Sequence, residues 1–136
     1  MNAVDTNVLI YANDPRDLRK QAIAAGLVKD LDDAALLWQV VCEFFSASRK
    51  LEPYGFVAAD AWHYVQRLGN AWQIMFPTWN VQTRAYELTN RYSISYWDAL
   101  LLGACKDAGV ERLYSEDLDT HDGIDGIEIV NPFRNP

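Results

Sequence analysis

Three acidic residues stand alone inside stretches of sequence that are otherwise uncharged and largely apolar. An ionised carboxylate in apolar surroundings costs on the order of several kcal/mol unless it is paired with a cation or bound to a metal ion. None of the three stretches contains a Lys or Arg that could supply the pairing locally. The three acids are Asp5 within residues 1–13, Glu43 within residues 36–48 and Asp98 within residues 92–105.

A single divalent cation shared by these acids would neutralise them more economically than three separate basic partners. Oxygen ligands of this kind favour Mg²⁺ or Mn²⁺ over zinc. A fourth ligand is expected from the acidic segment at residues 114–122, where Asp117 is the preferred candidate and Asp119 the alternative. We expect the other acids of this segment to lie in a solvated turn, and His121 to be an exposed loop residue.

Each acid also has a structural explanation that involves no metal. Asp5 could cap a helix that follows it, and Ser95 and Asp98 have the spacing of a helix capping box. Glu43 could lie on a solvated helix face. Because all three share one unusual environment, we favour a common site over three unrelated explanations.

Short apolar segments alternate with segments of helical periodicity along the chain. This order predicts an α/β fold in which a central parallel sheet is covered by helices on both faces. In such folds ligands bind beyond the carboxyl ends of the strands. We expect strands at residues 2–4, 34–38, 78–81, 111–115 and near 127–130, and helices at residues 8–12, 18–31, 39–50, 57–72, 82–92 and 95–108.

The composition fits a single globular domain over residues 1–136, since half of the residues are hydrophobic and 23% are charged. No apolar run approaches the roughly 20 residues of a membrane span, and the N-terminal segment lacks the basic start of a signal peptide. We therefore expect a cytoplasmic protein with no membrane partner. The two cysteines, Cys42 and Cys105, are expected to be buried thiols.

The formal net charge of −7 is unusual for a protein that binds nucleic acid, because such proteins usually present a basic surface. The negative net charge argues less strongly against nucleic-acid binding if the acidic residues gather at a metal site and the basic residues lie elsewhere. The basic residues do form small groups, at residues 16–20 and at Arg49 and Lys50.

Four segments together resemble PIN domains, and most closely the VapC-type toxins of bacterial toxin–antitoxin pairs. The segments are DTNVLIYA at residues 5–12, WQVVCEFF at 38–45, SYWDALLLGACKDAGVERLYSEDLD at 95–119 and IEIVNPF at 127–133. The resemblance implies a three-layer α/β/α fold around a parallel sheet.

The resemblance also implies a set of site residues. The catalytic, metal-binding acids of the family match Asp5, Glu43, Asp98 and Asp117, and its supporting polar residues match Asn7 and Ser115. Asp5 and Asp98 would be the main metal ligands, with Glu43 and Asp117 binding a second ion or acting through water. Asp119 departs from the family pattern and leaves the fourth acid ambiguous.

The implied activity is Mg²⁺- or Mn²⁺-dependent hydrolysis of phosphodiester bonds in a tRNA, rRNA or mRNA, with Arg49 or Lys50 contacting the RNA backbone. The implied partner is an antitoxin that inserts a basic residue into the acidic pocket. A homodimer is also expected. These partner surfaces could use Phe56, Trp62, Tyr64 or Trp72, although such aromatic residues more often belong to the core.

Three other functions remain open. A phosphatase or phospho-acceptor domain would use Asp5 as a nucleophile, although Asn7 occupies the place where such sites usually have a second acid. A non-catalytic PIN-like module would bind RNA or protein without cleaving it. A flap-cleaving DNA nuclease would need more acids and longer insertions than this chain has.

Overall fold

One sheet runs through the centre of the protein. The computed structural model describes residues 1–118 and 123–134, and its strands lie in the order β3-β2-β1-β4-β6-β5. All neighbouring strands are parallel except β5 and β6, which are antiparallel. The strands are β1 (Asn2–Val4), β2 (Ala34–Leu37), β3 (Gln73–Met75), β4 (Arg112–Tyr114), β5 (Gly123–Ile124) and β6 (Ile127–Val130).

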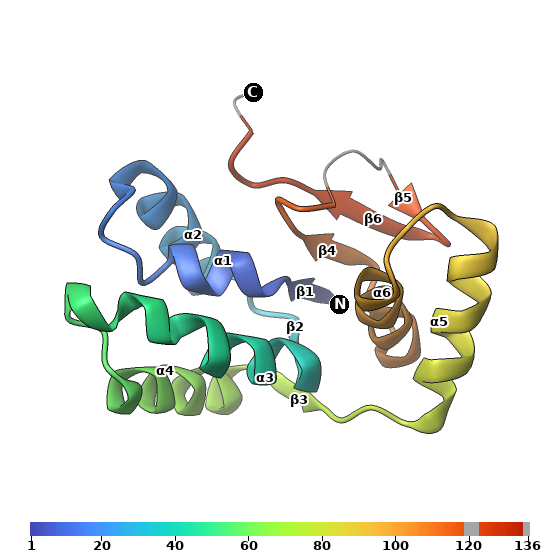
Figure 1. Ribbon diagram of the computed structural model, residues 1–136, viewed down its shortest axis with the longest axis horizontal. Helices are drawn as coiled ribbons and strands as arrows, with labels where there is room; N and C mark the ends of the chain where they lie inside the picture. The colour runs from blue at the N-terminus through green and yellow to red at the C-terminus, as the bar shows by residue number, and fades with distance from the viewer. Residues whose placement is uncertain (119–122, 135–136) are drawn as a thin grey trace.

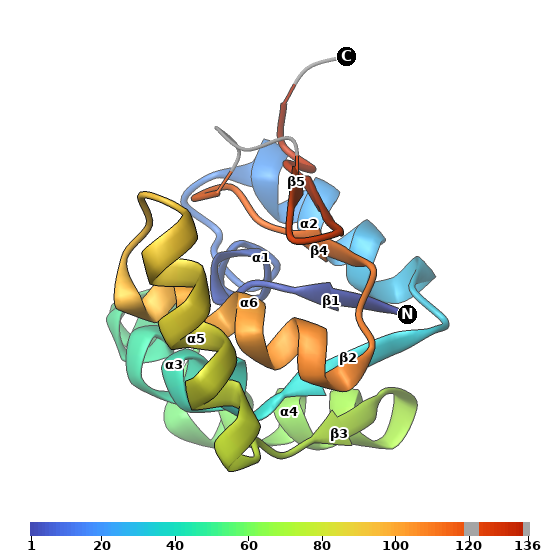
Figure 2. The ribbon, with the colours of Figure 1, turned by 90° about the vertical axis from the view of Figure 1, so that its right-hand side faces the viewer.

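Helices cover both faces of this sheet. Helices α1 to α4 lie on one side and α5 and α6 on the other, as Figure 1 shows to the left and right of the strands and Figure 2 shows from the side. The predicted α/β class with a central, mostly parallel sheet is confirmed. The helices are α1 (Thr6–Tyr11), α2 (Leu18–Asp30), α3 (Trp38–Ala47), the 3-10 helix η1 (Ser48–Tyr54), α4 (Ala58–Ala71), α5 (Trp79–Arg91) and α6 (Tyr96–Ala108).

The apolar runs of the sequence become the two-sided core that a covered parallel sheet requires. All four residues of β2 are buried, and so are Ala3 and Val4 of β1. Phe44 of α3 and Leu102 of α6 are also completely buried. Burial on both faces is the reason that these strands lack the alternation of polar and apolar residues.

Two strand predictions differ from the structure. Residues 78–81 were expected to form a strand, but Thr78 is the N-cap of α5 and the helix begins at Trp79. The strand in this region is instead β3, an edge strand with two exposed residues that pairs only with β2. The antiparallel β5 was not predicted, because a strand of two residues carries too little pattern to detect.

One burial prediction also differs from the structure. Cys42 is exposed, whereas Cys105 is buried as expected. Of the aromatic residues considered for partner surfaces, Tyr64 and Trp72 belong to the core, whereas Trp62 is exposed. The Trp72 indole N–H donates to the Leu31 carbonyl at 3.2 Å, which satisfies its polar atom within the fold. Among the helices of the described residues, none is both long and apolar enough to cross a membrane.

The packing of α5 against α6 gives a test of the fold. A Cβ added at Gly103 of α6 would lie 3.0 Å from the Val81 carbonyl oxygen of α5, which is backbone and can move only with its helix. We expect Gly103→Ala to lower the free energy of unfolding by about 1–2 kcal/mol.

Gly26 in α2 is the matched control, because a Cβ there meets nothing within 4 Å. Gly26→Ala should stabilise the protein by about 0.5–1 kcal/mol through helix propensity. Urea unfolding of both variants gives the comparison. Equal shifts of the same sign would contradict the described packing of α5 on α6.

Candidate active site

The carboxyl ends of β1, β2 and β4 lie next to one another, because these strands are parallel neighbours. Asp5 follows β1 directly and is the N-cap of α1. Its Oδ1 accepts a hydrogen bond from the Thr6 backbone N–H at 2.7 Å. Its Oδ2 accepts one from the Ser115 hydroxyl, which follows β4, at 2.8 Å. The Asp5 carboxylate is thus held at both oxygens by two different segments.

Glu43 approaches Asp5 from α3. Its Oε2 accepts a hydrogen bond from the Thr6 hydroxyl at 2.9 Å, so the residue after Asp5 connects the two acids. Its Oε1 accepts from Gln39 Nε2, one turn earlier on the same helix, at 3.0 Å. Both oxygens of Glu43 therefore have neutral donors.

Asp117 lies in the segment just beyond β4. Its Oδ2 accepts from Asn7 Nδ2 at 3.1 Å. The Asn7 side-chain oxygen in turn accepts from the Glu116 backbone N–H at 3.5 Å. Asn7 and Ser115 thus contact Asp117 and Asp5 respectively. Asp119, the alternative fourth acid, and His121 lie outside the described residues.

Asp98 lies in the first turn of α6. Its backbone N–H donates to the hydroxyl of the N-cap residue Ser95 at 3.1 Å, so this half of the expected capping arrangement is present. The cap uses the backbone of Asp98 and not its carboxylate. Gln39 Nε2 also donates to the carbonyl of the preceding residue, Trp97, at 3.3 Å, which ties α3 to the start of α6.

The electrostatics of Asp5 set it apart from the other acids. Burial raises its pKa from 3.8 to about 6, although the hydrogen bonds from Ser115 and Thr6 oppose the shift. The charges of Asp117 and Glu43 raise the pKa further, which means that both acids are close enough to repel Asp5. Beneath them, burial and the Asp5 charge raise the pKa of the Cys105 thiol.

No ion pair compensates this repulsion in the part of the chain that the structure describes. None of Asp5, Glu43, Asp98 and Asp117 takes part in an ion pair between described residues. The possible metal ligands of these four residues are all carboxylate oxygens, and such ligands suit Mg²⁺ or Mn²⁺. Among the described residues no three His, Cys, Asp or Glu side chains already converge as a metal site. The fit to a divalent ion therefore depends on donor chemistry and on uncompensated charge.

A polar pocket of ≈ 320 Å³ adjoins the acids on the side of Asp117. Lys50, one of the two residues expected to contact RNA, lines this pocket together with Arg16. Arg49 is exposed and does not line it. Two cationic side chains thus line the same pocket as Asp117, together with the acids Asp14 and Glu116.

The prediction that Glu116 lies in a solvated turn is wrong. Its carboxylate accepts from Lys20 Nζ at 2.6 Å and from the Tyr11 hydroxyl at 3.0 Å, and the Lys20–Glu116 pair is partly buried. The loop after β4 is therefore anchored to α1 and α2 by this pair. In this anchored loop, Asp117 lies within hydrogen-bond distance of Asn7.

Two residues with direct contacts to the acids, Thr6 and Gln39, were not predicted. Gln39 precedes Glu43 by four residues, which is the spacing of neighbours on one helix face, so this contact could have been found. Thr6 could not be distinguished in the sequence from an ordinary first residue of a helix.

The raised pKa of Asp5 has a consequence for stability. Its folded-state pKa of about 6 exceeds the ordinary value of 3.8, so the folded state retains a proton that the unfolded state has lost between these pH values. Stability therefore falls as the pH rises through this window. A shift of about two pKa units corresponds to a cost of up to ~3 kcal/mol at pH 7.

We expect Asp5→Asn to remove this cost and to make the metal-free protein more stable than wild type at pH 7. The difference should shrink toward pH 4. Urea unfolding in EDTA at a series of pH values measures it, with Asp32→Asn, an exposed acid in the turn before β2, as the control. Equal or lower stability of Asp5→Asn at pH 7 would contradict the description of Asp5 as an uncompensated buried charge.

Comparisons with known proteins agree with this fold. Residues 3–126 match the family model of the PIN domain. The structure is similar to VapC20 of Mycobacterium tuberculosis, a toxin that cleaves the sarcin–ricin loop, with a TM-score of 0.70 at 19% identity over 94% of this chain and 99% of that one. No curated protein matches the chain in a sequence comparison.

Two further solved structures share the fold. A toxin–antitoxin complex from Klebsiella pneumoniae has a TM-score of 0.69 at 19% identity and covers 97% of this chain and 98% of that one. FitAB bound to a DNA fragment has a TM-score of 0.71 at 15% identity and covers 100% of this chain and 98% of that one. At such low identities these similarities establish the fold, and the family-model match over most of the sequence establishes the family: the chain belongs to the PIN-domain family.

Proposed function

We propose that this protein is a divalent-metal-dependent endoribonuclease and the toxin of a toxin–antitoxin pair. The observation that carries the proposal is the buried Asp5 carboxylate, whose pKa is raised to about 6 and which is repelled by Glu43 and Asp117. A site with this excess of negative charge favours a cation, and phosphate would be repelled without one. The similarity to a toxin that cleaves the sarcin–ricin loop supports the choice of RNA as substrate.

In this proposal Asp5, Glu43, Asp98 and Asp117 hold Mg²⁺ or Mn²⁺. The bound ion would supply positive charge to offset the charge that develops on the phosphate and would lower the pKa of the attacking water.

The protein's own contacts orient the acids for this task. Thr6 donates to Asp5 through its backbone and to Glu43 through its hydroxyl, so one residue fixes the relative position of both carboxylates. Ser115 fixes the second oxygen of Asp5, and Asn7 fixes Asp117. Such second contacts typically account for about 10–100-fold in metal affinity or activity.

Lys50 and Arg16 extend the site toward the substrate backbone. Both line the polar pocket beside Asp117. Arg16 already forms a two-pronged pair with Asp14, with nitrogen–oxygen distances of 2.9 Å. Lys50 is therefore the residue of the two that we assign to a phosphate of the RNA.

The use of Asp5 as a phospho-acceptor is disfavoured by its surroundings. Phospho-acceptor sites usually have a second acid two residues after the nucleophile, and Asn7 occupies that place here and donates to Asp117. A non-catalytic module has no need for four acids without a basic partner. The cleavage experiment below decides between this module and a nuclease.

We also propose a partner antitoxin that inserts a basic side chain among the acids, where an Arg could form charge-assisted, two-pronged hydrogen bonds. The similar toxin–antitoxin complexes support this proposal. We further propose a homodimer and a cytoplasmic location, where RNA and antitoxin are both accessible. Exposed aromatic residues such as Trp62 and Tyr86 are available for contacts between proteins.

Asp98→Asn is expected to reduce RNA cleavage at least ~100-fold, because it removes a negative charge from the cation site. The fold should be unaffected, since the Ser95 cap uses the backbone N–H of Asp98. Cleavage of total RNA with Mn²⁺ measures the effect, and thermal unfolding checks the fold. The control is Asp30→Asn at the far end of α2.

Full cleavage by the Asp98→Asn variant, or by wild type in EDTA, would reject the proposal. Bound RNA without any cleavage, in wild type with Mn²⁺ present, would instead favour the non-catalytic module.

A divalent ion should stabilise wild type and have a smaller effect on Asp5→Asn. At ten times its dissociation constant, Mn²⁺ would raise the free energy of unfolding by about 1.4 kcal/mol. Thermal unfolding with increasing Mn²⁺ measures this, with Asp30→Asn again as the control. An identical response of wild type and Asp5→Asn would show that Asp5 is not a ligand.

A further inference from the structure

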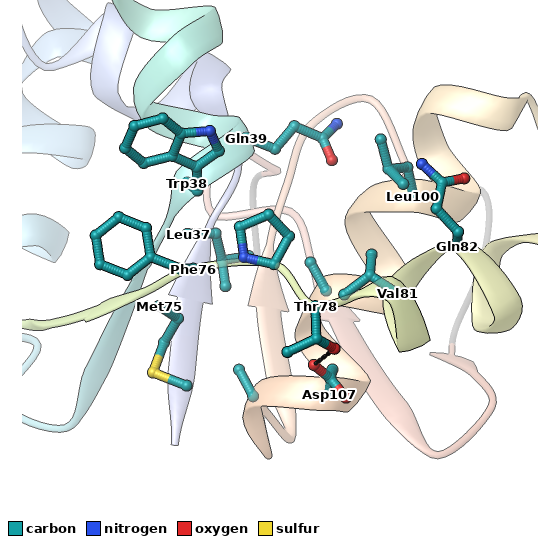
Figure 3. Close-up of a pocket in the computed structure, with 13 residues that line it drawn as sticks. Leu37, Trp38, Gln39, Met75, Phe76, Thr78, Val81, Gln82, Leu100 and Asp107 are labelled. Atoms are coloured by element: carbon teal, nitrogen blue, oxygen red, sulfur yellow. Dashed lines mark hydrogen bonds between the residues drawn. The ribbon is translucent and has the colours of Figure 1, made fainter.

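A second pocket shares one residue, Gln39, with the contacts of the acidic site. It has a volume of ≈ 250 Å³ and is bounded by the end of β2, the segment after β3, and the helices α5 and α6 (Figure 3). Its walls are mainly apolar, and they include Leu37, Val81 and Leu100. The site described above does not use this pocket.

Two aromatic rings with exposed faces form one side of the pocket. Trp38 is 46% exposed and Phe76 is 65% exposed. Their ring centroids lie 5.3 Å apart at an interplanar angle of 38°, and Figure 3 shows both rings on the same side of the pocket. Exposed aromatic faces of this kind are the surfaces on which unpaired RNA bases stack.

Polar groups for the edges of a base are present on the other side. Gln82 Oε1 accepts from the Tyr96 hydroxyl at 2.8 Å, and no described residue accepts from its Nε2. Gln39 Oε1 is a buried acceptor without a partner among the described residues.

The charge of the pocket excludes a phosphate. No Lys or Arg lines it, and its one acid is Asp107. The Asp107 carboxylate already accepts from Thr78 at 3.0 Å and from Asn80 at 3.1 Å, and Arg84 lies 3.9 Å away. The pocket therefore suits a flat, neutral group with polar edges better than an anion or a cation.

Gln39 joins this pocket to the acids. It lines the pocket, and its Nε2 donates to Glu43 Oε1. A group bound in the pocket would therefore share the Gln39 side chain with Glu43, one of the acids of the site.

We propose that this pocket binds one unpaired base of the RNA substrate, next to the scissile phosphate, with Trp38 and Phe76 as its stacking surface. This inference rests on the proposed ribonuclease function. It makes Trp38 a determinant of where the RNA is cut.

The first test uses neutral nucleosides, because their binding requires neither metal nor cleavage. Adenosine, guanosine, cytidine and uridine are added in EDTA to ¹⁵N-labelled full-length protein, and the indole N–H signals are followed by NMR. The Trp38 signal, assigned with Trp38→Phe, should shift saturably with at least one nucleoside. The signal of Trp62 should not, although Trp62 is 55% exposed and stacks on Phe45 in a comparable way.

The second test measures RNA cleavage with Mn²⁺. In a substrate scanned with single abasic sites, loss of one base beside the cut should lower kcat/KM about tenfold for wild type. Trp38→Ala should show the same loss with the intact substrate and no further loss with the abasic one. Trp62→Ala should behave as wild type. Phe76→Ala, in a loop, provides a second variant if Trp38→Ala does not fold.

The outcomes separate this inference from the proposed function. If RNA is cleaved but no nucleoside shifts Trp38 and no abasic position matters, the base pocket is refuted and the ribonuclease remains. If nucleosides shift Trp38 but RNA is not cleaved, the base site stands and the ribonuclease fails. If Trp38→Ala changes only the molecular mass in light scattering, the pocket is a protein contact and the inference is overturned.

Discussion

The site depends on one constraint, the burial of a negative charge at the end of β1. Asp5 is 7% exposed and lies near two other acids that raise its pKa. Its hydrogen bonds from Thr6 and Ser115 hold the carboxylate in place but do not neutralise it. A carboxylate in this position favours either a proton or a cation, and at neutral pH a pKa of about 6 leaves the cation as the better solution.

The sheet order explains why such distant residues meet. Because β1 lies between β2 and β4, the segments that follow these three strands share one edge. Thr6 then joins Asp5 to Glu43, and Gln39 joins Glu43 to the start of α6. The same Gln39 borders the aromatic pocket, so one side chain contacts Glu43 and lines the proposed base site.

Much of this arrangement could be predicted from the sequence, for physical reasons. The buried residues of β1 and β2 require apolar runs, and a lone acid at the end of such a run is visible without a structure. β3 was missed because an exposed edge strand has no core pattern. Tyr64 and Trp72 belong to the core, which is the commoner place for such aromatic residues, but the sequence did not separate them from the exposed Trp62. Thr6 and Gln39 were missed because neutral polar residues near acids are common, and only the three-dimensional contacts give them a role.

The pKa of Asp5 in the metal-free protein is the most direct measure of the constraint. It can be read from the side-chain carboxyl ¹³C shift during an NMR pH titration, repeated in Asp117→Asn, whose charge contributes to the shift. The account predicts a midpoint near pH 6 in wild type and a lower one in the variant. A midpoint at or below the ordinary value of 3.8, unchanged by the substitution, would mean that Asp5 is already compensated and that the site has no electrostatic need for a cation.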